Sequence, residues 1–311
     1  MGPVVRALLV ASAALLAGSW IGLGRPERLA RGETSVTPAS VAPPSPSPEP
    51  TVPRLPQEID PSLVPALAPF PRTNPEGSIA KAWSVADGAS RRAHDGRRLV
   101  TLTFDDGPTP ETTPQVLRLL AKHHVRATFF VIGRYLDTER DRAKEARRVL
   151  GRVAAAGHLI GNHSHDHVDL AWRSPAEVVD QIDRSAAAIE RVTGKRPILF
   201  RPPYGKLDAF GERAVRERGL ELVLWNVEAR DMQRGDPDEM FQDLAQQLDA
   251  KQGGVVLLHD VKRSTLPVLK RLLEFLRDRP YDPARPDHWG YEIVDLPEYF
   301  REVGASAPAE G

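Results

Sequence analysis

The chain has 311 residues, which is enough for one large domain or two small ones. It balances 42 basic against 42 acidic residues, so it lacks the surplus of Lys and Arg with which a nucleic-acid-binding protein neutralises phosphates. It contains no cysteine, which excludes disulfides, cysteine-ligated zinc and thiol catalysis. Any metal must therefore be held by His, Asp or Glu.

An apolar segment lies at the N-terminus. The basic residue Arg6 precedes an uncharged stretch from Ala7 to Gly24, and charge returns at Arg25. This length lies between that of the apolar region of a signal peptide and that of a membrane-spanning helix. We predict that residues 1–24 form a signal peptide or an N-terminal membrane anchor that contacts the membrane at least during export. The rest of the chain is then exported, and is extracellular, in the cell wall or anchored to the membrane.

Proline is concentrated in the next segment. Residues 25–77 hold 14 of the 29 prolines of the chain. Proline fixes φ and removes the amide donor, so such a segment forms no packed core. We predict a disordered, proline-rich linker and lead-in over residues 25–96, with a docking site for a proline-binding partner as the alternative.

From about residue 97, short β-branched runs alternate with amphipathic stretches. The predicted strands are Leu99–Phe104, Ala127–Ile132, His158–Asn162, Ile198–Arg201, Leu220–Val227, Gly254–His259 and Tyr291–Leu296. The predicted helices are Thr113–His123, Thr138–Ala156, Pro175–Thr193, Ala209–Arg218, Pro237–Ala250 and Leu266–Asp278. Strict alternation predicts an α/β fold with a parallel sheet and outer helices. The number of units favours an incomplete (β/α) barrel over an open sheet.

Four polar clusters directly follow predicted strands. They are Thr103-Phe-Asp-Asp-Gly-Pro108, His163-Ser-His-Asp-His167, Arg201-Pro-Pro-Tyr-Gly205 and Leu257-Leu-His-Asp260. In a parallel α/β barrel, the loops at the carboxyl ends of the strands converge on one site. We therefore expect these clusters to meet in space, although they lie far apart in the sequence.

Carboxylates and histidines in these clusters suit a metal ion. Asp105 and Asp106 are adjacent, and two bare carboxylates repel unless a cation binds one of them. The alternative is a helix cap, although Pro108 and Pro110 delay the following helix. His163 and His167 are four residues apart, which places both rings on one face of a helical turn. The same spacing points His165 elsewhere, and we expect it to face solvent or to support the ligands.

Taken together and in this order, the four motifs resemble those of the polysaccharide deacetylases, the NodB-homology domain of carbohydrate esterase family 4. The resemblance covers residues 97–303 as the catalytic domain and leaves 304–311 as a tail. It implies a distorted (β/α)7 TIM-like barrel of the glycoside hydrolase and deacetylase type. It also implies one divalent metal, usually Zn²⁺, with Co²⁺, Ni²⁺ or Mn²⁺ as alternatives. The implied reaction is hydrolysis of acetyl groups on an acetylated polysaccharide, and we expect a monomer.

The resemblance assigns a role to each residue that matches the motifs. Asp106, His163 and His167 would bind the metal. The other assigned groups are Asp105 as the base, Arg201 as the residue that orients it, His259 as the acid, Asp231 as the residue that raises the pKa of His259, the Tyr204 backbone amide as the oxyanion donor, and Leu257 with Tyr204 as substrate contacts.

One segment departs from the family pattern. Asp231 is followed by Met232, where the family usually has a tryptophan that walls the substrate groove. Glu228 stands where an aspartate is more common. The groups needed for chemistry are present, so the departure concerns the choice of substrate. An N-acetyl group of peptidoglycan or of a chitin-like glycan is the favoured target, and an O-acetyl group of xylan is the alternative.

Two readings from other classes of protein compete with this one. His167, Asp169 and His259 together resemble the two-histidine, one-carboxylate iron site of oxygenases, but such sites usually sit on all-β barrels. A surface-tethered glycan-binding module without activity is the second competitor. The presence of both Asp105 and His259 argues against it.

Overall fold

The computed structural model describes residues 93, 95–285 and 290–304. The apolar segment 1–24, residues 25–92 and 94 of the predicted linker and lead-in 25–96, and residues 305–311 of the predicted tail lie outside the described residues, so the predictions for them stay predictions. Within the described ranges, no helix combines the length and the apolar character needed to span a bilayer.

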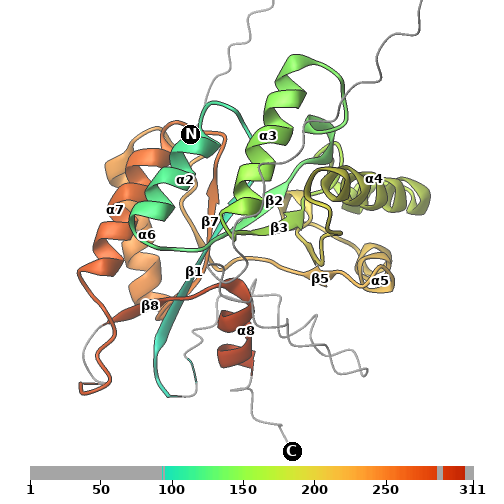
Figure 1. The fold of residues 1–311 in the computed structure, drawn as a ribbon. Helices are drawn as coiled ribbons and strands as arrows, with labels where there is room; N and C mark the ends of the chain where they lie inside the picture. Colours follow the sequence, from blue (N-terminus) through green and yellow to red (C-terminus); the bar gives the residue numbers. More distant parts are fainter. Residues whose placement is uncertain (1–92, 94, 286–289, 305–311) are drawn as a thin grey trace, which may run out of the picture. The chain divides into compact units, whose positions relative to one another are not determined.

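The described residues alternate strands and helices along the chain, as predicted (Figure 1). The strands are β1 (Arg98–Asp105), β2 (Thr128–Val131), β3 (Leu159–Asn162), β4 (Leu199–Phe200), β5 (Glu221–Leu222), β6 (Val227–Glu228), β7 (Gly254–His259) and β8 (Tyr291–Ile293). The α-helices are α2 (Thr113–Lys122), α3 (Asp141–Ala155), α4 (Pro175–Thr193), α5 (Ala209–Glu217), α6 (Pro237–Lys251), α7 (Thr265–Arg277) and α8 (Leu296–Gly304). Three short 3-10 helices follow β2, β3 and β4: η3 (Gly133–Tyr135), η4 (Leu170–Trp172) and η5 (Pro203–Gly205).

All strand pairs in this sheet are parallel, in the order β5-β4-β3-β2-β1-β7-β6, with β8 beside β1. The register places Asp105 of β1 opposite His259 of β7 and opposite Phe130 of β2. Asn162 of β3 lies opposite Phe200 of β4. The carboxyl ends of β1, β2, β3, β4 and β7 therefore finish at one edge of the sheet, which brings the loops that follow them together.

The predicted strand Leu220–Val227 is wrong as a single element. The structure has two short strands there, β5 and β6, which pair with β4 and with β7 at opposite ends of the sheet. Residues 223–226 cross between these ends without joining them by strand pairing, so the curved sheet is a partly open barrel. The expectation of a distorted, incomplete (β/α) barrel is confirmed.

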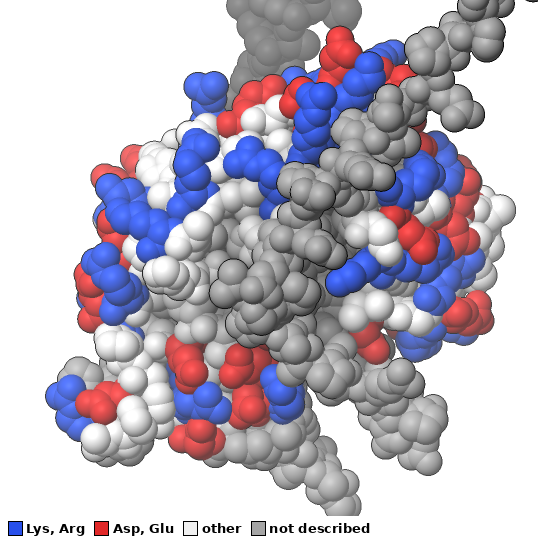
Figure 2. Space-filling model, in the orientation of Figure 1, with Lys and Arg blue, Asp and Glu red and all other residues white. Residues whose placement is uncertain are grey.

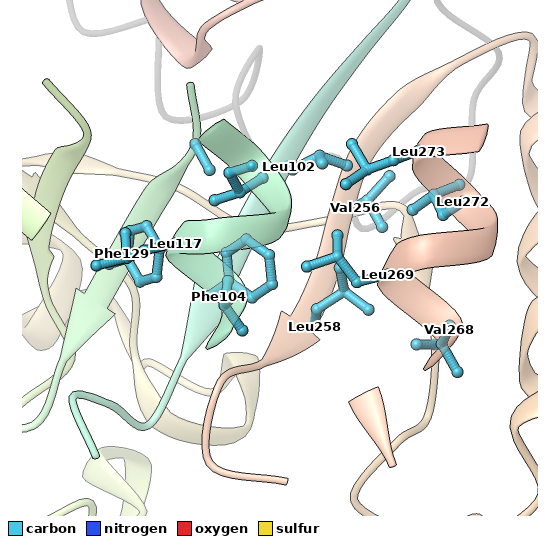
Figure 3. Packing of buried hydrophobic residues seen from close by; sticks show 14 of the residues in the cluster. Leu102, Phe104, Leu117, Phe129, Val256, Leu258, Val268, Leu269, Leu272 and Leu273 are labelled. Carbon is cyan, nitrogen blue, oxygen red and sulfur yellow. The ribbon is translucent and has the colours of Figure 1, made fainter. Parts of the chain in front are cut away.

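The side chains of β1 separate the two sides of the sheet. Val100, Leu102 and Phe104 belong to a buried cluster that includes residues of α2 and α7, as Figure 3 shows for Phe104 against Leu117, Leu258 and Leu269. The alternating residues Thr101, Thr103 and Asp105 are also buried but point to the other face, inside the barrel. The interior thus becomes polar toward the carboxyl ends of the strands.

Helix α8 closes the other end of the interior and was not predicted. Its residues Tyr299, Phe300 and Val303 pack with Leu99 and Val255 near the amino ends of β1 and β7. The predicted strand Tyr291–Leu296 ends early, at Ile293, and the chain turns into this helix.

The helix-start signal at Ser174 is confirmed. The Ser174 hydroxyl accepts a hydrogen bond from the amide of Glu177, whose carboxylate accepts in turn from the Ser174 amide, and this reciprocal cap begins α4.

On the face seen in Figure 2, basic and acidic side chains are intermixed.

Candidate active site

Three side chains at the carboxyl edge converge as the sequence predicted. Asp106 follows β1, while His163 and His167 belong to the loop after β3. His167 Nε2 lies 3.1 Å from Asp106 Oδ1, and His163 Nε2 lies 3.5 Å from the same oxygen. One ligand atom from each residue lies within 4.8 Å of the others, which makes this group a candidate metal site.

The orientation of His163 is fixed by the neighbouring strand. Its Nδ1 lies 2.7 Å from the backbone carbonyl oxygen of Arg201. Because a carbonyl oxygen only accepts, Nδ1 donates to it, and Nε2 is the nitrogen that faces Asp106 and is left to bind a metal. Metal-ligating histidines are typically held in this way by the nitrogen that does not bind the metal.

Asp106 is a buried carboxylate that a bound cation would stabilise. Its Oδ1 is buried without a hydrogen-bond donor, and its backbone has φ 73°, in the left-handed region that favours glycine. Burial alone raises the pKa of Asp106, but the nearby rings of His163 and His167 outweigh burial and hold this pKa well below its ordinary value. The carboxylate is therefore ionised.

The spacing of these atoms fits a divalent cation. Bonds of about 2.1 Å to His nitrogen or carboxylate oxygen, arranged tetrahedrally, separate neighbouring ligand atoms by about 3.4 Å. The two measured separations from Asp106 Oδ1, 3.1 and 3.5 Å, lie on either side of this value. The residues present thus fit a divalent metal.

Asp105 is held by a buried guanidinium. Arg201 Nη1 donates to Asp105 Oδ1 at 2.8 Å and to the Thr103 hydroxyl at 2.8 Å, and the arginine is fully buried. Its remaining nitrogens donate to the carbonyl oxygens of Val223 and Leu224 in the crossing segment. The Arg201 side chain therefore ties the open part of the barrel to β1 and fixes one oxygen of Asp105. The other oxygen, Oδ2, lies 3.6 Å from His163 Nε2.

His259 and Asp231 form a second pair next to Asp106. Asp231 Oδ1 accepts from His259 Nδ1 at 2.7 Å, and Oδ2 accepts from the His259 amide at 2.8 Å and from the Thr265 hydroxyl at 2.5 Å. His259 Nε2 is then directed toward Asp106, 4.0 Å from Oδ2. Burial lowers the pKa of His259, but the Asp231 carboxylate outweighs it and raises this pKa to about 9.

Tyr204 and Leu257 border the same edge. The Tyr204 ring meets the His167 ring edge-on, with centroids 4.9 Å apart, and its backbone has φ 61°. Tyr204 is 59% exposed, so one face of the site is open to solvent. Leu257 is buried two residues before His259 and provides an apolar surface next to these polar groups.

Comparison with known proteins agrees with this geometry. The sequence profile of the family described as polysaccharide deacetylase matches residues 92–223. A chitooligosaccharide deacetylase from Bradyrhizobium sp. (strain ANU 289) is 37% identical over 166 residues, which cover 53% of this chain and 72% of that protein. The chain belongs to the polysaccharide deacetylase family.

Other members of this family differ in what they do. The peptidoglycan-N-acetylglucosamine deacetylase PgdA of Listeria monocytogenes serotype 1/2a (strain 10403S) is 33% identical over 203 residues. The match covers 65% of this chain but only 39% of the length of PgdA. A crystal structure of a CE4 family pseudoenzyme from Bacillus anthracis superposes with a TM-score of 0.56 and 27% identity, covering 67% of each chain. Membership alone therefore does not establish activity.

The segment that departs from the family pattern, with Glu228 and Met232, includes Asp231, the partner of His259. Met232 is 39% exposed, next to the buried Asp231. Glu228 accepts a hydrogen bond from the Trp225 indole nitrogen at 2.9 Å, and its other oxygen lies 3.5 Å from Arg230. Glu228 thus supports neighbouring side chains, while Met232 presents a flexible apolar surface to solvent.

His165 and Asp169 have surroundings that differ from those considered in the sequence analysis. His165 is 3% exposed and contacts Asp137 and Asp166. Of the two alternatives expected for it, exposure to solvent is wrong, and support of the ligands stays a prediction. Asp169 caps η4 through the amide of Ala171 and pairs with Lys206 at 3.1 Å. These contacts occupy the Asp169 carboxylate. The carboxylate that lies beside His167 is that of Asp106, which disfavours the iron site of oxygenases that His167, Asp169 and His259 would form.

Asp260 is a polar group of the edge to which the sequence analysis gave no role. It is fully buried, accepts from the Thr113 hydroxyl, and leaves no room for a side chain at Gly107, where a Cβ would come within 2.2 Å of Oδ1. Burial raises the pKa of Asp260 to about 7. Its position in the Leu-Leu-His-Asp motif was a signal, but only the packing against the loop after β1 shows what it touches.

Proposed function

We propose that this protein is a metal-dependent polysaccharide deacetylase that hydrolyses N-acetyl groups of a cell-envelope glycan. The observation that carries the proposal is the placement of two hydrogen-bonded pairs, Asp105 with Arg201 and His259 with Asp231, next to the metal-capable group around Asp106. The pairs supply a fixed carboxylate and a protonated imidazole, which are the base and the acid that amide hydrolysis requires.

The metal would be held by Asp106, His163 and His167, and we propose zinc. One carboxylate and two imidazoles form a donor set that zinc accepts, and three protein ligands leave a position open, as in catalytic zinc sites. When bound, the cation polarises the acetyl carbonyl and lowers the pKa of water beside it. Co²⁺, Ni²⁺ and Mn²⁺ are alternative metals for the same ligands, and metal analysis of the purified protein distinguishes them from zinc.

Asp105 would act as the general base. Arg201 occupies Oδ1, so Oδ2 remains to take the proton of the attacking water. The guanidinium also prevents Asp105 from turning away, because its other donors are anchored to backbone carbonyls of the crossing segment. The buried arginine therefore orients the base.

His259 would act as the general acid. Because Asp231 accepts the Nδ1 proton, Nε2 is the nitrogen that faces the site and delivers a proton to the departing amine. The pKa of about 9 keeps the ring protonated at neutral pH, and a neighbouring cation lowers that value toward the working range. Amines leave poorly without a proton, so this step is needed for an amide more than for an ester.

Tyr204 and Leu257 would position the acetyl group. The left-handed backbone of Tyr204 lies beside His167, where its amide can meet charge that develops on the carbonyl oxygen. Buried Leu257 would line the pocket for the acetyl methyl group. These two contacts separate the polar end of the acetyl group from its apolar end.

Peptidoglycan is the substrate that we favour, and the site of action is outside the cytoplasmic membrane. The Listeria relative is named for deacetylation of peptidoglycan N-acetylglucosamine, and the apolar stretch Ala7–Gly24 suits export. A protease added to intact spheroplasts should then digest the catalytic domain. Digestion only after lysis would contradict export.

Acetate release from a panel of glycans tests the function. Purified protein would be incubated with peptidoglycan, chitin oligomers and acetylxylan, each with and without a chelator, and bound metal would be measured per chain. We expect one divalent metal, acetate from N-acetylated glycans, and loss of release after chelation. Release from acetylxylan alone would indicate an O-acetyl esterase. Binding of glycan without any release would indicate a module resembling the pseudoenzyme.

A further inference from the structure

The metal-ligand loop, defined as His163–His167, has a strained backbone. Ser164 has φ 63° and His167 has φ 57°, both in the left-handed region, and neither is glycine. A residue other than glycine is disfavoured in this region, because its Cβ lies too close to the following carbonyl oxygen. A loop of this kind keeps its shape only when surrounding contacts over-determine it. Since His167 is itself a proposed ligand, those contacts decide where its ring points.

The backbone of the loop is attached on one side to the segment after β2. The amide of Gly133 donates to the Ser164 carbonyl at 3.1 Å, and the amide of Arg134 donates to the His165 carbonyl at 2.9 Å. The Arg134 guanidinium donates to the Asp166 carbonyl at 3.0 Å. These bonds fix the carbonyl oxygens of the loop but leave its amides to other partners.

Helix α4 supplies the partner of two of these amides through one side chain. Gln181 Oε1 accepts from the His165 amide at 3.2 Å and from the Asp166 amide at 2.7 Å. Gln181 Nε2 donates to Asp166 Oδ2 at 2.7 Å. The loop therefore lies between two attachments, one to the segment after β2 and one to α4.

The His165 ring joins these two attachments. It is buried, with Nδ1 3.0 Å from Asp166 Oδ1 and Nε2 3.2 Å from Asp137 Oδ2. Asp137 belongs to the segment after β2 and also pairs with Arg191 of α4. A carboxylate thus lies within hydrogen-bond distance of each ring nitrogen, and both carboxylates are themselves held by side chains of α4.

We propose that His165 is a positioning residue: held between Asp137 and Asp166, its ring keeps the metal-ligand loop in its strained shape and thereby sets the metal affinity of the site. The inference rests on the proposed metal site. His165 lies between the two ligand histidines in the sequence, but its ring points away from them, so it acts through the backbone of the loop. Residues that orient metal ligands typically contribute about 10–100-fold to metal affinity.

The His165→Phe variant tests this role, because phenylalanine keeps a planar ring but has no nitrogen to bond either carboxylate. Zinc affinity would be measured by competition with a chromogenic chelator, and the geometry of the site by the visible spectrum of the Co²⁺-loaded protein. We expect zinc binding to weaken by about 10–100-fold and the Co²⁺ bands to change. Thermal unfolding in a chelator would report stability separately from metal binding.

His158→Phe is the matched control. His158 is also buried and immediately precedes β3, but it lies at the opposite end of that strand and bonds only the amide of Ala127 among its recorded hydrogen bonds. This variant should lower the unfolding temperature in a chelator while the zinc affinity and the Co²⁺ spectrum stay those of the wild type. An equal loss of affinity in both histidine variants would overturn the inference, because the effect would then follow general destabilisation.

Asp137→Ala provides a second measurement on a partly exposed residue, whose removal leaves the core intact. We expect a smaller loss of zinc affinity, about three- to tenfold, and no further loss when it is combined with His165→Phe, because both remove one network. Wild-type affinity in either single variant would overturn the positioning role alone. Failure of the wild-type protein to bind any divalent metal would instead contradict the proposed function and this inference together.

Discussion

The two ends of the parallel strands differ in how their charged side chains are paired. At the amino ends, Arg97 binds Asp95, Glu292 and Glu302, each within 2.9 Å, so every one of these charges meets an opposite charge directly. At the carboxyl ends, two adjacent carboxylates are buried, and only one of them, Asp105, receives a guanidinium. Asp106 keeps a buried oxygen without a donor.

This difference separates groups that stabilise the fold from groups arranged for chemistry. The ion pairs of Arg97 join the start of β1 to β8 and α8, which suits a structural role. The carboxyl edge instead combines buried unpaired oxygen with left-handed backbone at Asp106, His167 and Tyr204. Strain and a buried unpaired oxygen are unfavourable for folding alone, and at this edge a bound ligand would relieve them.

Asp106→Asn should have the largest effect of any single change at the carboxyl edge. It replaces an anionic ligand with a neutral one, so the metal is lost, and with it both the polarised carbonyl and the activated water. We expect deacetylation to fall by more than about 10⁴-fold. Metal content and acetate release would be measured together, and a variant that keeps full metal content would contradict the ligand role.

Asp105→Asn should separate the two adjacent carboxylates. The metal should remain bound, because Asp105 is proposed to take the proton of the attacking water and not to bind the metal. We expect the rate to fall by about 10²–10⁴-fold at unchanged metal content. If the Asp105 and Asp106 variants lost metal equally, the two carboxylates would share one role and the assignment would fail.

His259→Ala should discriminate between substrates. We expect a loss of about 10²–10³-fold on N-acetyl glycans and less than about tenfold on an activated aryl acetate, whose leaving group needs no proton. Metal content should match that of the wild type. Equal losses on both substrates would remove His259 from the acid role.

Asp231→Asn should shift the pH profile. The carboxylate raises the pKa of His259, and the acid must be protonated to work, so activity declines as pH rises through that pKa. Without the negative charge, burial dominates and the pKa falls, which moves the alkaline limb of the profile to lower pH. We expect roughly tenfold less activity at pH 8.5 and a smaller difference at pH 6.5. Asp238→Asn, an exposed change on α6, is the control, and an unshifted limb would contradict the coupling.

Arg97→Ala should have the smallest effect on activity. It removes the ion pairs at the amino ends, and partly exposed pairs of this kind contribute about 1 kcal/mol to stability. We expect the free energy of unfolding in urea to fall by about that amount, while kcat and metal content stay unchanged. A loss of activity comparable to that of Asp231→Asn would erase the distinction between the two ends.

Strand β3 shows where reading the sequence stops. It has a buried histidine close to each end, His158 before it and His163 after it; the sequence assigned the metal-ligand role to His163 and no role to His158. In the structure, burial helped by Arg126 lowers the pKa of His158 to about 4, so it stays neutral and accepts from a backbone amide. His163 instead faces Asp106. Side-chain chemistry depends on neighbours contributed by other strands.

The sequence by itself determined the alternation of strands and helices, the partly open barrel, and the meeting of Asp106, His163 and His167. These follow from local periodicity and from the rule that parallel strands bring their carboxyl ends to one edge. The tertiary structure alone decided the splitting of β5 from β6, the helix α8, and the partners of His165 and Asp260. Those outcomes depend on which distant surfaces come into contact, because a short strand or a buried polar group is stabilised by residues that lie far away in the chain.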